Sequence, residues 1–502
     1  MIISKTANPA SAPRRRAPWA AAAILSAGIL IAGCSAVDLP ERTSSSDASF
    51  FDTDEVHSIS IEYDDADYEA MIDAYAETDS KEWISATVAI DGQTFEEVGL
   101  RLKGNSSLRG LGNDQRGPSA QAEDDDAAAQ TNAPQGEGFS EGGGTVSADD
   151  PAGLPWLIRL DKYVDGQEYA GRSDFVVRGN NTETSLNEAV ALYAINQANV
   201  AGEEAAYTRL SVNGSDEQLR LVIDLPDDDA WNDDAFGGTG ITYKADSEGD
   251  YSYRGEDSEG YLDAFDVKFE ADGLSQDAAY APLIAFLNFI NNSTDEEFEE
   301  HLSDYLEVDS FADYLAVQDL VSNADDIDGP GNNSYLHYDP ETGLMTVVAW
   351  DQNLSFGGLG GMGVGGPQGG GAGERMMPAD GEERPDPSTL PTEAPTDVPD
   401  GAHTGEESAP RGMQMGGTNV LSSRFLANDT FHSAYDTALD TLIASVYDSG
   451  DAQAYLDDLV ALLTDQASDL VDANTIQTEA DSIASMLTGD SVSRQGTDVS
   501  QG

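Results

Sequence analysis

Residues 323–357 read NADDIDGPGNNSYLHYDPETGLMTVVAWDQNLSFG, and this stretch decides the fold that we expect. The segments SYLHY and LMTVVAW have the composition of β-strands. Between them, DPETG has a Pro after its first residue and a Gly at its end, which is typical of a turn. The stretch therefore predicts a β-hairpin whose two ends carry polar clusters.

The hairpin is expected to bring two possible metal ligands to one place. If Tyr338 pairs with Leu344, then Asn333 faces Ala349, and Asp351 lies about two residues, or roughly 7 Å, further along the partner strand. Carboxylate and amide oxygens beside phosphates suit Mg²⁺, which binds through one or two carboxylates. The alternative is a solvated Asp/Asn loop, because 94 of the 502 residues are acidic.

Two further carboxylates precede the hairpin. Asp325 and Asp326 follow a segment that we expect to be helical as far as Asn323. The glycines and proline at 329–331 prevent the helix from continuing through the intervening loop. Both carboxylates therefore enter the end of the hairpin where Asn333 is expected.

The composition restricts the class of protein. The formal charge is −70, which favours solvated surfaces and metal cations and disfavours nucleic acid. We therefore expect no nucleic-acid partner. The five histidines are scattered without the spacing of zinc ligands, so a zinc hydrolase is not supported. With 50 Gly and 20 Pro in 502 residues, we expect one large domain interrupted by disordered insertions.

The N-terminus has the order of a bacterial lipoprotein signal. Arg14, Arg15 and Arg16 precede an apolar run at 17–30, and IAGCS places small residues directly before Cys34. We expect an acylated Cys34 that anchors the mature chain on the extracytoplasmic face of the cell membrane. The alternative is an ordinary secretory signal with a chance cysteine.

Changes in composition predict the organisation of the chain. Periodic apolar segments define the folded parts, and Gly-rich, Pro-rich and acidic tracts define the rest. The expected parts are a signal peptide at 1–33, a Ser/Asp-rich tether at 34–54, a domain at 55–357 with a disordered insertion at about 111–153, a low-complexity linker at 358–417, a helical part at 418–488 and a disordered tail at 489–502.

Local patterns predict the main helices and strands. Alternating or apolar runs indicate strands within 56–63, 83–104, 154–164, 174–178, 208–214, 218–225 and 240–246, with a hairpin turn at Asp91-Gly92. Helical spacing indicates a helix at 65–77, an amphipathic helix at 185–200, two or three helices within 278–322, and further helices after the linker. The fold class is therefore α+β.

The stretch 323–357 resembles the signature of the spore coat protein H (CotH) kinase-like family, with its Asp pair, its Asn before a Tyr-rich strand, its D-P-E-T-G turn and its Trp-Asp before Phe-Gly. Other segments resemble the family in the same order over roughly 300 residues. They are VAIDGQTFEEVGLRLKGNSS at 88–107, LIRLDKYVDGQEYAG at 157–171, SLNEAVALYAINQANV at 185–200, RLSVNG at 209–214, GITYKAD at 240–246 and VLSSRFLAND at 420–429.

The resemblance implies an atypical, two-lobed protein-kinase-like fold that transfers the γ-phosphoryl of ATP to Ser or Thr. Asp325 matches the catalytic aspartate that accepts the hydroxyl proton, and Asp326 remains a rival for this role. Asn333 and Asp351 match the metal-binding pair, and Asn353 offers a further oxygen. The implied cofactor is ATP with Mg²⁺, with Mn²⁺ or Ca²⁺ as alternatives.

Binding of ATP to so acidic a chain requires local cations. Lys103, Lys244, Arg101 and Arg159 are candidates for phosphate contacts, and the alternative for each is an ion pair with one of the abundant acids. Glu188 is a candidate for orienting a lysine, as a helical glutamate does in ordinary kinases. A solvated position on the helix is the alternative for Glu188.

Two departures from the family pattern bear on activity. Asn353 replaces the second Asp of the family's Trp-Asp-x-Asp motif, and Asp224 stands where the family has Glu. The main hypothesis is a lipid-anchored kinase that acts on a protein substrate, either Ser-rich or itself. The alternative is a non-catalytic pseudokinase whose acidic surface binds cations or partner proteins.

Overall fold

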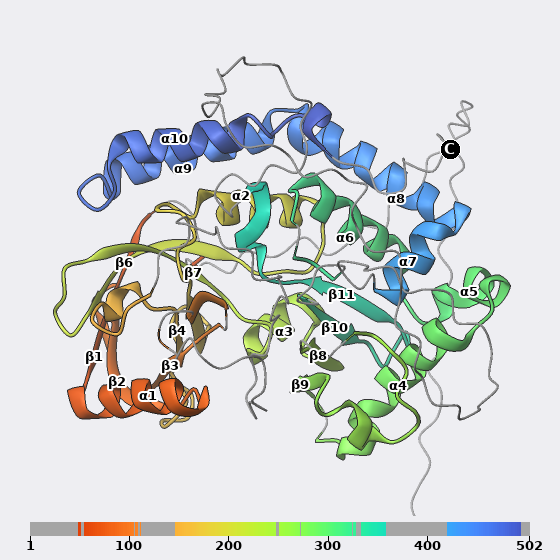
Figure 1. Cartoon of the computed structure of the whole chain (residues 1–502), viewed down its shortest axis with the longest axis horizontal. Helices are drawn as coiled ribbons and strands as arrows, with labels where there is room; N and C mark the ends of the chain where they lie inside the picture. Colours follow the sequence, from red (N-terminus) through yellow and green to blue (C-terminus); the bar gives the residue numbers. More distant parts are fainter. Residues whose placement is uncertain are drawn as a thin grey trace, which may run out of the picture. The chain divides into compact units, whose positions relative to one another are not determined.

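The computed structural model of the chain describes residues 49–51, 55–104, 106–108, 111, 146–246, 250–271, 273–323, 325–327, 333–357 and 419–492. These residues form a mixed α+β structure, as the sequence predicts (Figure 1). The predicted signal peptide, Cys34 and the predicted linker at 358–417 lie outside the described residues. No helix of the described part is long and apolar enough to cross a membrane.

Seven strands close into a barrel, which the sequence did not predict. In spatial order they are β1 (His57–Tyr63), β2 (Ile84–Ile90), β3 (Gln93–Leu102), β4 (Trp156–Arg159), β5 (Asp174–Val177), β7 (Gln218–Ile223) and β6 (Ala205–Val212). Neighbouring strands are antiparallel, except that β1 and β6 pair in parallel and close the barrel. Closure leaves no unpaired edge strand.

The hairpin of β2 and β3 shows how local sequence fixes part of this barrel. Asp91 and Gly92 have φ values of 46° and 82°, so both central turn residues are left-handed, as a type I′ turn requires. The predicted turn is confirmed. Alternate residues such as Val88 and Leu100 are buried in a hydrophobic cluster of the barrel.

The second sheet contains the quoted hairpin. Its strands are β8 (Ile241–Ala245), β9 (Phe265–Glu270), β10 (Ser334–Tyr338) and β11 (Met345–Ala349), in the order β11-β10-β8-β9. The hairpin is confirmed, but the expected register is wrong by one residue, because Tyr338 pairs with Met345. The Asp339 N–H donates to the Leu344 carbonyl at 3.0 Å, so the turn begins one position later than expected. Asn333 therefore precedes the pair formed by Ser334 and Ala349.

Ten α-helices are present in the described part. They are α1 (Asp65–Thr78), α2 (Leu186–Gln197), α3 (Asp229–Phe236), α4 (Gln276–Asn292), α5 (Asp295–His301), α6 (Val308–Leu320), α7 (Val420–Ala427), α8 (Asp429–Leu442), α9 (Asp451–Gln466) and α10 (Ala473–Ala484). Two or three helices were expected within 278–322, and the structure has three there, α4, α5 and α6. Helix α3 and strand β9 were not predicted.

Helix α2 differs from the amphipathic helix that its sequence suggests. Nine of its residues, from Leu186 to Ile195, are buried, including Asn187 and Glu188. Helices α9 and α10 pack on α2, and α8 packs on α6, so the C-terminal helices cover the elements that precede the linker (Figure 1). Glu188 is therefore not the solvated helix position that was the alternative from sequence.

Two predicted boundaries need correction. Phe50 and Phe51 fall in the predicted tether, but they are 1% and 8% exposed, and Phe50 stacks on His57 at 4.3 Å. Most of the predicted insertion at about 111–153 lies outside the described residues, yet 146–153 is part of the packed structure. Ala152 is fully buried there, because this segment contacts the barrel. The packed chain thus begins before residue 55 and resumes before residue 154.

Candidate active site

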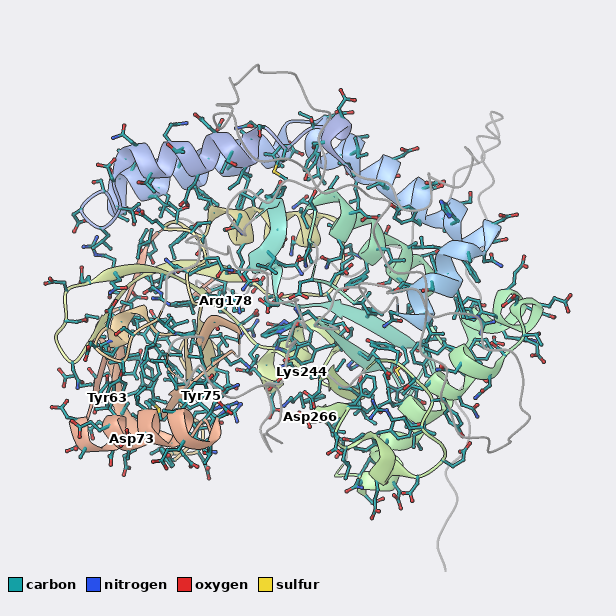
Figure 2. The ribbon with its side chains drawn as sticks, viewed as in Figure 1. Tyr63, Asp73, Tyr75, Arg178, Lys244 and Asp266 are labelled. Carbon is teal, nitrogen blue, oxygen red and sulfur yellow. The ribbon has the colours of Figure 1, made fainter. Side chains whose placement is uncertain are left out.

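The candidate site lies where β5 and β11 end. Arg178 follows β5, and Asp351 follows β11 by two residues. The guanidinium of Arg178 donates from Nη2 to Oδ1 of Asp351, and its Nε lies 2.8 Å from Oε1 of Glu188 on α2. Figure 2 shows Arg178 and Lys244 near the centre of the molecule, away from its outer helices. One arginine thus joins the barrel, α2 and the end of the hairpin.

This ion-pair network is buried. Glu188 is 2% exposed, and burial raises its pKa although Arg178 opposes this shift. Burial also opposes the charge of Arg178, but Glu188 and Asp351 outweigh it and the pKa of Arg178 is raised. Glu188 therefore orients an arginine, and not the lysine that the sequence suggested. Arg178 was missed as a site residue, although it is the last residue of the strand predicted at 174–178.

The backbone around Asp351 is constrained. Asp351 has a φ of 60°, a left-handed conformation that is uncommon for residues other than glycine. Its N–H donates to Oε1 of Glu203 at 3.0 Å. Glu203 is 4% exposed, and burial raises the pKa of its carboxyl to about 8. Nothing in the sequence indicated Glu203, because its proximity to Asp351 depends on the packing of the segment before β6 against the end of β11.

The other carboxylate cluster reaches the same end of the hairpin. The side-chain amide of Asn333 donates to Oδ2 of Asp325 at 2.9 Å, and the Asp325 N–H donates to Oδ1 of Asn323 at 3.2 Å. Asn333 directly precedes β10, and Asp351 follows β11, so the antiparallel pairing places them at one sheet end. Asp326 is also close in sequence but is 6% exposed.

Whether these groups fit a metal ion depends on their free oxygens. Among the described residues, Oδ1 of Asn333 is buried and has no hydrogen-bond partner. The described part contains no group of three or more His, Cys, Asp or Glu side chains that could hold a metal. One carboxylate, one amide and the oxygens of a phosphate or water form a set that suits Mg²⁺. Asn333 and Asp351 fit this set, and Asn353 is partly buried two residues further on.

Two lysines lie beside the residue that precedes Asp351. The Nζ atoms of Lys103 and Lys244 are 5.6 and 5.8 Å from the centre of the Trp350 ring. Both lysines are buried, at 4% and 3% exposed. Lys103 directly follows β3 of the barrel, and Lys244 lies on β8 of the second sheet, so each sheet contributes one cation. The structure thus places two of the four candidates for phosphate contacts at the same tryptophan ring.

A second group of cations surrounds Trp83. Arg101 and Arg159 lie 5.0 and 5.6 Å from the centre of this ring, and Lys162 lies 4.7 Å away. Arg159 also donates to Asp174 through two nitrogens, with a shortest distance of 2.6 Å. For Arg159 the ion-pair alternative is therefore the one found, and a phosphate contact would have to replace this pair.

Asp224 takes no part in the contacts described around Asp351. It is fully buried after β7, and its Oδ1 accepts the Glu204 N–H at 2.7 Å. Burial raises its pKa well above the ordinary value. The nearest cation in an ion pair with it is Arg172, at 3.7 Å. The carboxylate that does contact the Asp351 backbone is Glu203.

Comparison with known families shows which family the chain belongs to. A family model described as CotH kinase protein matches residues 150–484. The chain belongs to the CotH kinase protein family. The CotH match includes Arg178, Glu188, the hairpin and the C-terminal helices, but it begins after Lys103. A comparison with curated proteins gives no match.

Proposed function

We propose that this protein is an atypical, two-lobed protein kinase that transfers the γ-phosphoryl of ATP to Ser or Thr of surface proteins or of itself. Membership of the CotH kinase protein family supports kinase activity. The observation that carries the proposal is the position of Asp351. It lies between the buried Arg178–Glu188 pair and Glu203, beside the lysines around Trp350.

In this proposal, Asp351 and Asn333 hold Mg²⁺, with Mn²⁺ or Ca²⁺ as alternatives. A bound ion would neutralise charge on the phosphate oxygens of ATP. Arg178 and Glu188 fix the carboxylate of Asp351, because Arg178 contacts both and is itself buried. The pairing of Arg178 with one oxygen of Asp351 leaves the second oxygen of this carboxylate to face a cation.

Lys103 and Lys244 provide the positive charge that ATP requires. On a chain with a formal charge of −70, a triphosphate approaches only where the local potential is reversed. Both lysines are held against Trp350, one residue from Asp351. Arg101 is the next cation along β3, two residues before Lys103. A triphosphate on these cations would have its terminal phosphate near Asp351.

Asp325 is proposed to accept the proton of the attacking Ser or Thr hydroxyl. The amide of Asn333 donates to Oδ2 of Asp325 and therefore orients this carboxylate. Oδ1 of Asp325 would then receive the proton while the hydroxyl oxygen attacks the γ-phosphorus and the ADP oxygen leaves. Asp326, which is more buried, remains the rival for this role.

Calorimetric titration of Mg-ATP into three proteins tests the proposal. Asp351→Asn is expected to abolish metal-dependent binding of ATP, because it removes the anionic ligand and keeps the size of the side chain. Asp325→Asn is expected to bind ATP like the parent and to lose transfer of labelled phosphate, because its role begins only with the hydroxyl. Absence of ATP binding by the parent would refute the site.

A non-catalytic function is the second candidate. It is favoured by Asn353, which lacks the charge of the second Asp in the family motif, and by the ion pair that already engages Asp351. Binding of Mg-ATP by the parent without transfer of label to itself or to a Ser-rich protein would favour this pseudokinase. The acidic surface would then bind cations or partner proteins.

The proposed location is the extracytoplasmic face of the cell membrane, with the lipid anchor at Cys34. The order of the basic, apolar and small residues before Cys34 supports this location. Phe50 and Phe51 are already packed, so the tether proposed at 34–54 would have to end before Phe50.

A further inference from the structure

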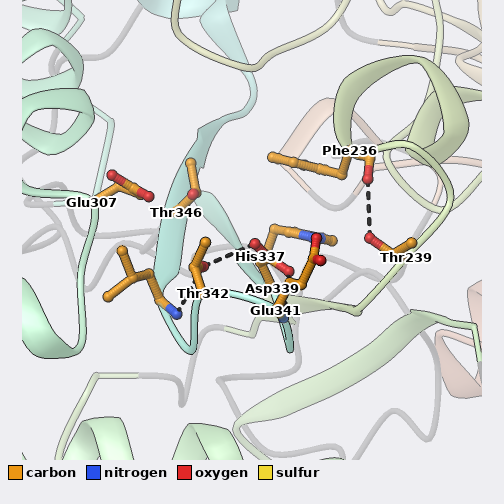
Figure 3. A pocket seen from close by; sticks show the side chains of 9 residues that line it. Phe236, Thr239, Glu307, His337, Asp339, Glu341, Thr342 and Thr346 are labelled. Carbon is orange, nitrogen blue, oxygen red and sulfur yellow. Dashed lines mark hydrogen bonds between the residues drawn. The ribbon is translucent and has the colours of Figure 1, made fainter. Parts of the chain in front are cut away.

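A pocket lies at the other end of the β10–β11 hairpin, next to its turn. It has a volume of about 330 Å³ and is lined by residues of β10, β11, the turn, the loop after α3 and the start of α6 (Figure 3). His337 forms part of its wall. His337 is four residues from Asn333 along the strand, or about 13 Å, so the pocket is separate from the candidate active site.

Hydrogen bonds determine which nitrogen of His337 carries the proton. The amide of Asn232 donates to the carbonyls of Pro226 and Asp228 at 2.7 and 2.9 Å, so its oxygen faces the other way. That oxygen accepts a hydrogen bond from the hydroxyl of Thr242 at 2.5 Å. The Thr242 oxygen must then accept from Nδ1 of His337, at 3.0 Å. Nε2 of His337 therefore carries a lone pair and is a hydrogen-bond acceptor.

This acceptor has no partner within the described part of the chain. Nε2 of His337 is buried and unpaired there, and the residue is 1% exposed. Burial lowers the pKa of His337 to about 4, so the ring is neutral at pH 7. A Cβ at Gly240 would lie 2.9 Å from Nε2 and 2.1 Å from the carbonyl oxygen of Tyr338, so only glycine fits beside this nitrogen. A buried acceptor without a donor is costly, and a ligand N–H would remove that cost.

Three carboxylates belong to the same pocket. They are Glu307 at the start of α6, and Asp339 and Glu341 in the hairpin turn. Within the described residues, no Lys or Arg forms an ion pair with any of the three. Asp339 accepts from the Glu341 N–H and the Thr342 hydroxyl, both at 2.8 Å. Burial opposes its ionisation, but these hydrogen bonds outweigh burial and lower its pKa.

We propose that this pocket binds an ammonium group, carried either by a lysine side chain of a peptide or by a small free amine. One N–H of the ammonium donates to Nε2 of His337, and the carboxylates of Glu307, Asp339 and Glu341 balance its charge. A bare metal ion fits less well, because the described part contains no group of three or more His, Cys, Asp or Glu side chains, at this pocket or elsewhere, that could hold one. The ammonium supplies both of the things that the pocket lacks, which are a donor and a positive charge.

The test measures binding and not catalysis, so it is independent of the kinase proposal. Titration calorimetry at 0.15 M salt is run with the peptide acetyl-Gly-Lys-Gly-amide, its Nε-acetyl-lysine counterpart, and n-butylammonium. The pocket variant carries both Glu307→Gln and Glu341→Gln. The matched control variant carries both Glu69→Gln and Glu296→Gln. All four glutamates are exposed, so both double variants should fold and both remove two charges.

We expect the parent to bind the lysine peptide and not its acetylated form. The pocket variant should bind about fivefold to tenfold more weakly, and the control variant should bind like the parent. Equal weakening in both double variants would overturn the proposal, because general attraction to the acidic chain would explain the binding. Absence of binding by the parent to both amines would also overturn it. Tighter binding of the peptide than of n-butylammonium would identify a lysine side chain as the ligand, and equal binding would identify a free amine.

Two substitutions of His337 test the role of Nε2 directly. His337→Asn can still donate to Thr242 in place of Nδ1, but it has no atom at the position of Nε2. His337→Gln reaches that position and can accept there. We expect the Asn variant to lose affinity for the amine and the Gln variant to retain more of it. The reverse order, in variants that unfold cooperatively in urea, would contradict the assignment of Nε2 as the acceptor.

Discussion

Glu203 provides a quantitative test of the packing around Asp351. Its Oε1 accepts the Asp351 N–H at 3.0 Å, and its Oε2 is buried with no hydrogen-bond partner among the described residues. Glu203→Gln keeps an oxygen that can accept from Asp351, and it removes a group that can ionise. The variant therefore separates the hydrogen bond from the cost of burying a charge.

The magnitude follows from the pKa of Glu203, which burial raises from 4.5 to about 8. Because the folded protein holds this proton more tightly than the unfolded chain, the stabilising contribution is complete below pH 4.5 and is lost as the pH rises to about 8. The full shift corresponds to at most about 5 kcal/mol. Glu203→Gln does not ionise, so it should be more stable than the parent above pH 8 by a few kcal/mol and nearly equal to it at pH 5.

Urea unfolding of the parent and the variant at pH 5 and pH 9 measures this difference. Glu62→Gln is the matched control, because Glu62 is an exposed glutamate on β1. The control removes the same charge and should change stability little at either pH. A stability difference between Glu203→Gln and the parent that is the same at both pH values would refute the reasoning, because the buried carboxyl would then not be the group that titrates.

Three further predictions concern other parts of the chain. Arg178→Met should destabilise the fold at pH 7 by about 3–5 kcal/mol, because it leaves buried Glu188 without its partner, and adding Glu188→Gln should recover part of the loss in urea unfolding. Lys103→Gln and Lys244→Gln should each weaken ATP binding at least about tenfold in titration calorimetry while leaving cooperative unfolding intact, and unchanged affinity would exclude phosphate contacts. Cys34→Ala should release the protein from the membrane fraction, and equal retention would contradict the lipid anchor.

The elements that sequence predicted best are those specified by neighbouring residues. The Asp91-Gly92 turn requires two left-handed residues, and the sequence supplies residue types that tolerate this conformation. The β10–β11 hairpin was predicted from its strand composition and its turn. Its register was wrong by one residue, because DPETG allows two positions for the first cross-strand pair and only the backbone hydrogen bond from Asp339 to Leu344 distinguishes them.

The candidate site was predicted only in part, for a related reason. Asn333 and Asp351 flank the two ends of one hairpin, and Asp325 precedes Asn333 by eight residues, so their convergence follows mainly from local pairing. Arg178 and Glu203 come from other elements, and no local pattern connects them to Asp351. Their roles depend on how the end of β5 and the segment before β6 pack against the end of β11.

The sequence by itself determined most strands and helices, the hairpin with its polar ends and the resemblance to the CotH kinase protein family. Short-range periodicity, turn chemistry and motif order are properties of neighbouring residues. Only the tertiary structure decided that seven strands close into a barrel through β1 and β6, and that α2 is buried beneath α9 and α10. It also decided that Glu188 pairs with Arg178 and that Lys103 meets Lys244 at Trp350. These outcomes depend on contacts between residues far apart in the chain, and burial then sets the charges and pKa values that the candidate site requires.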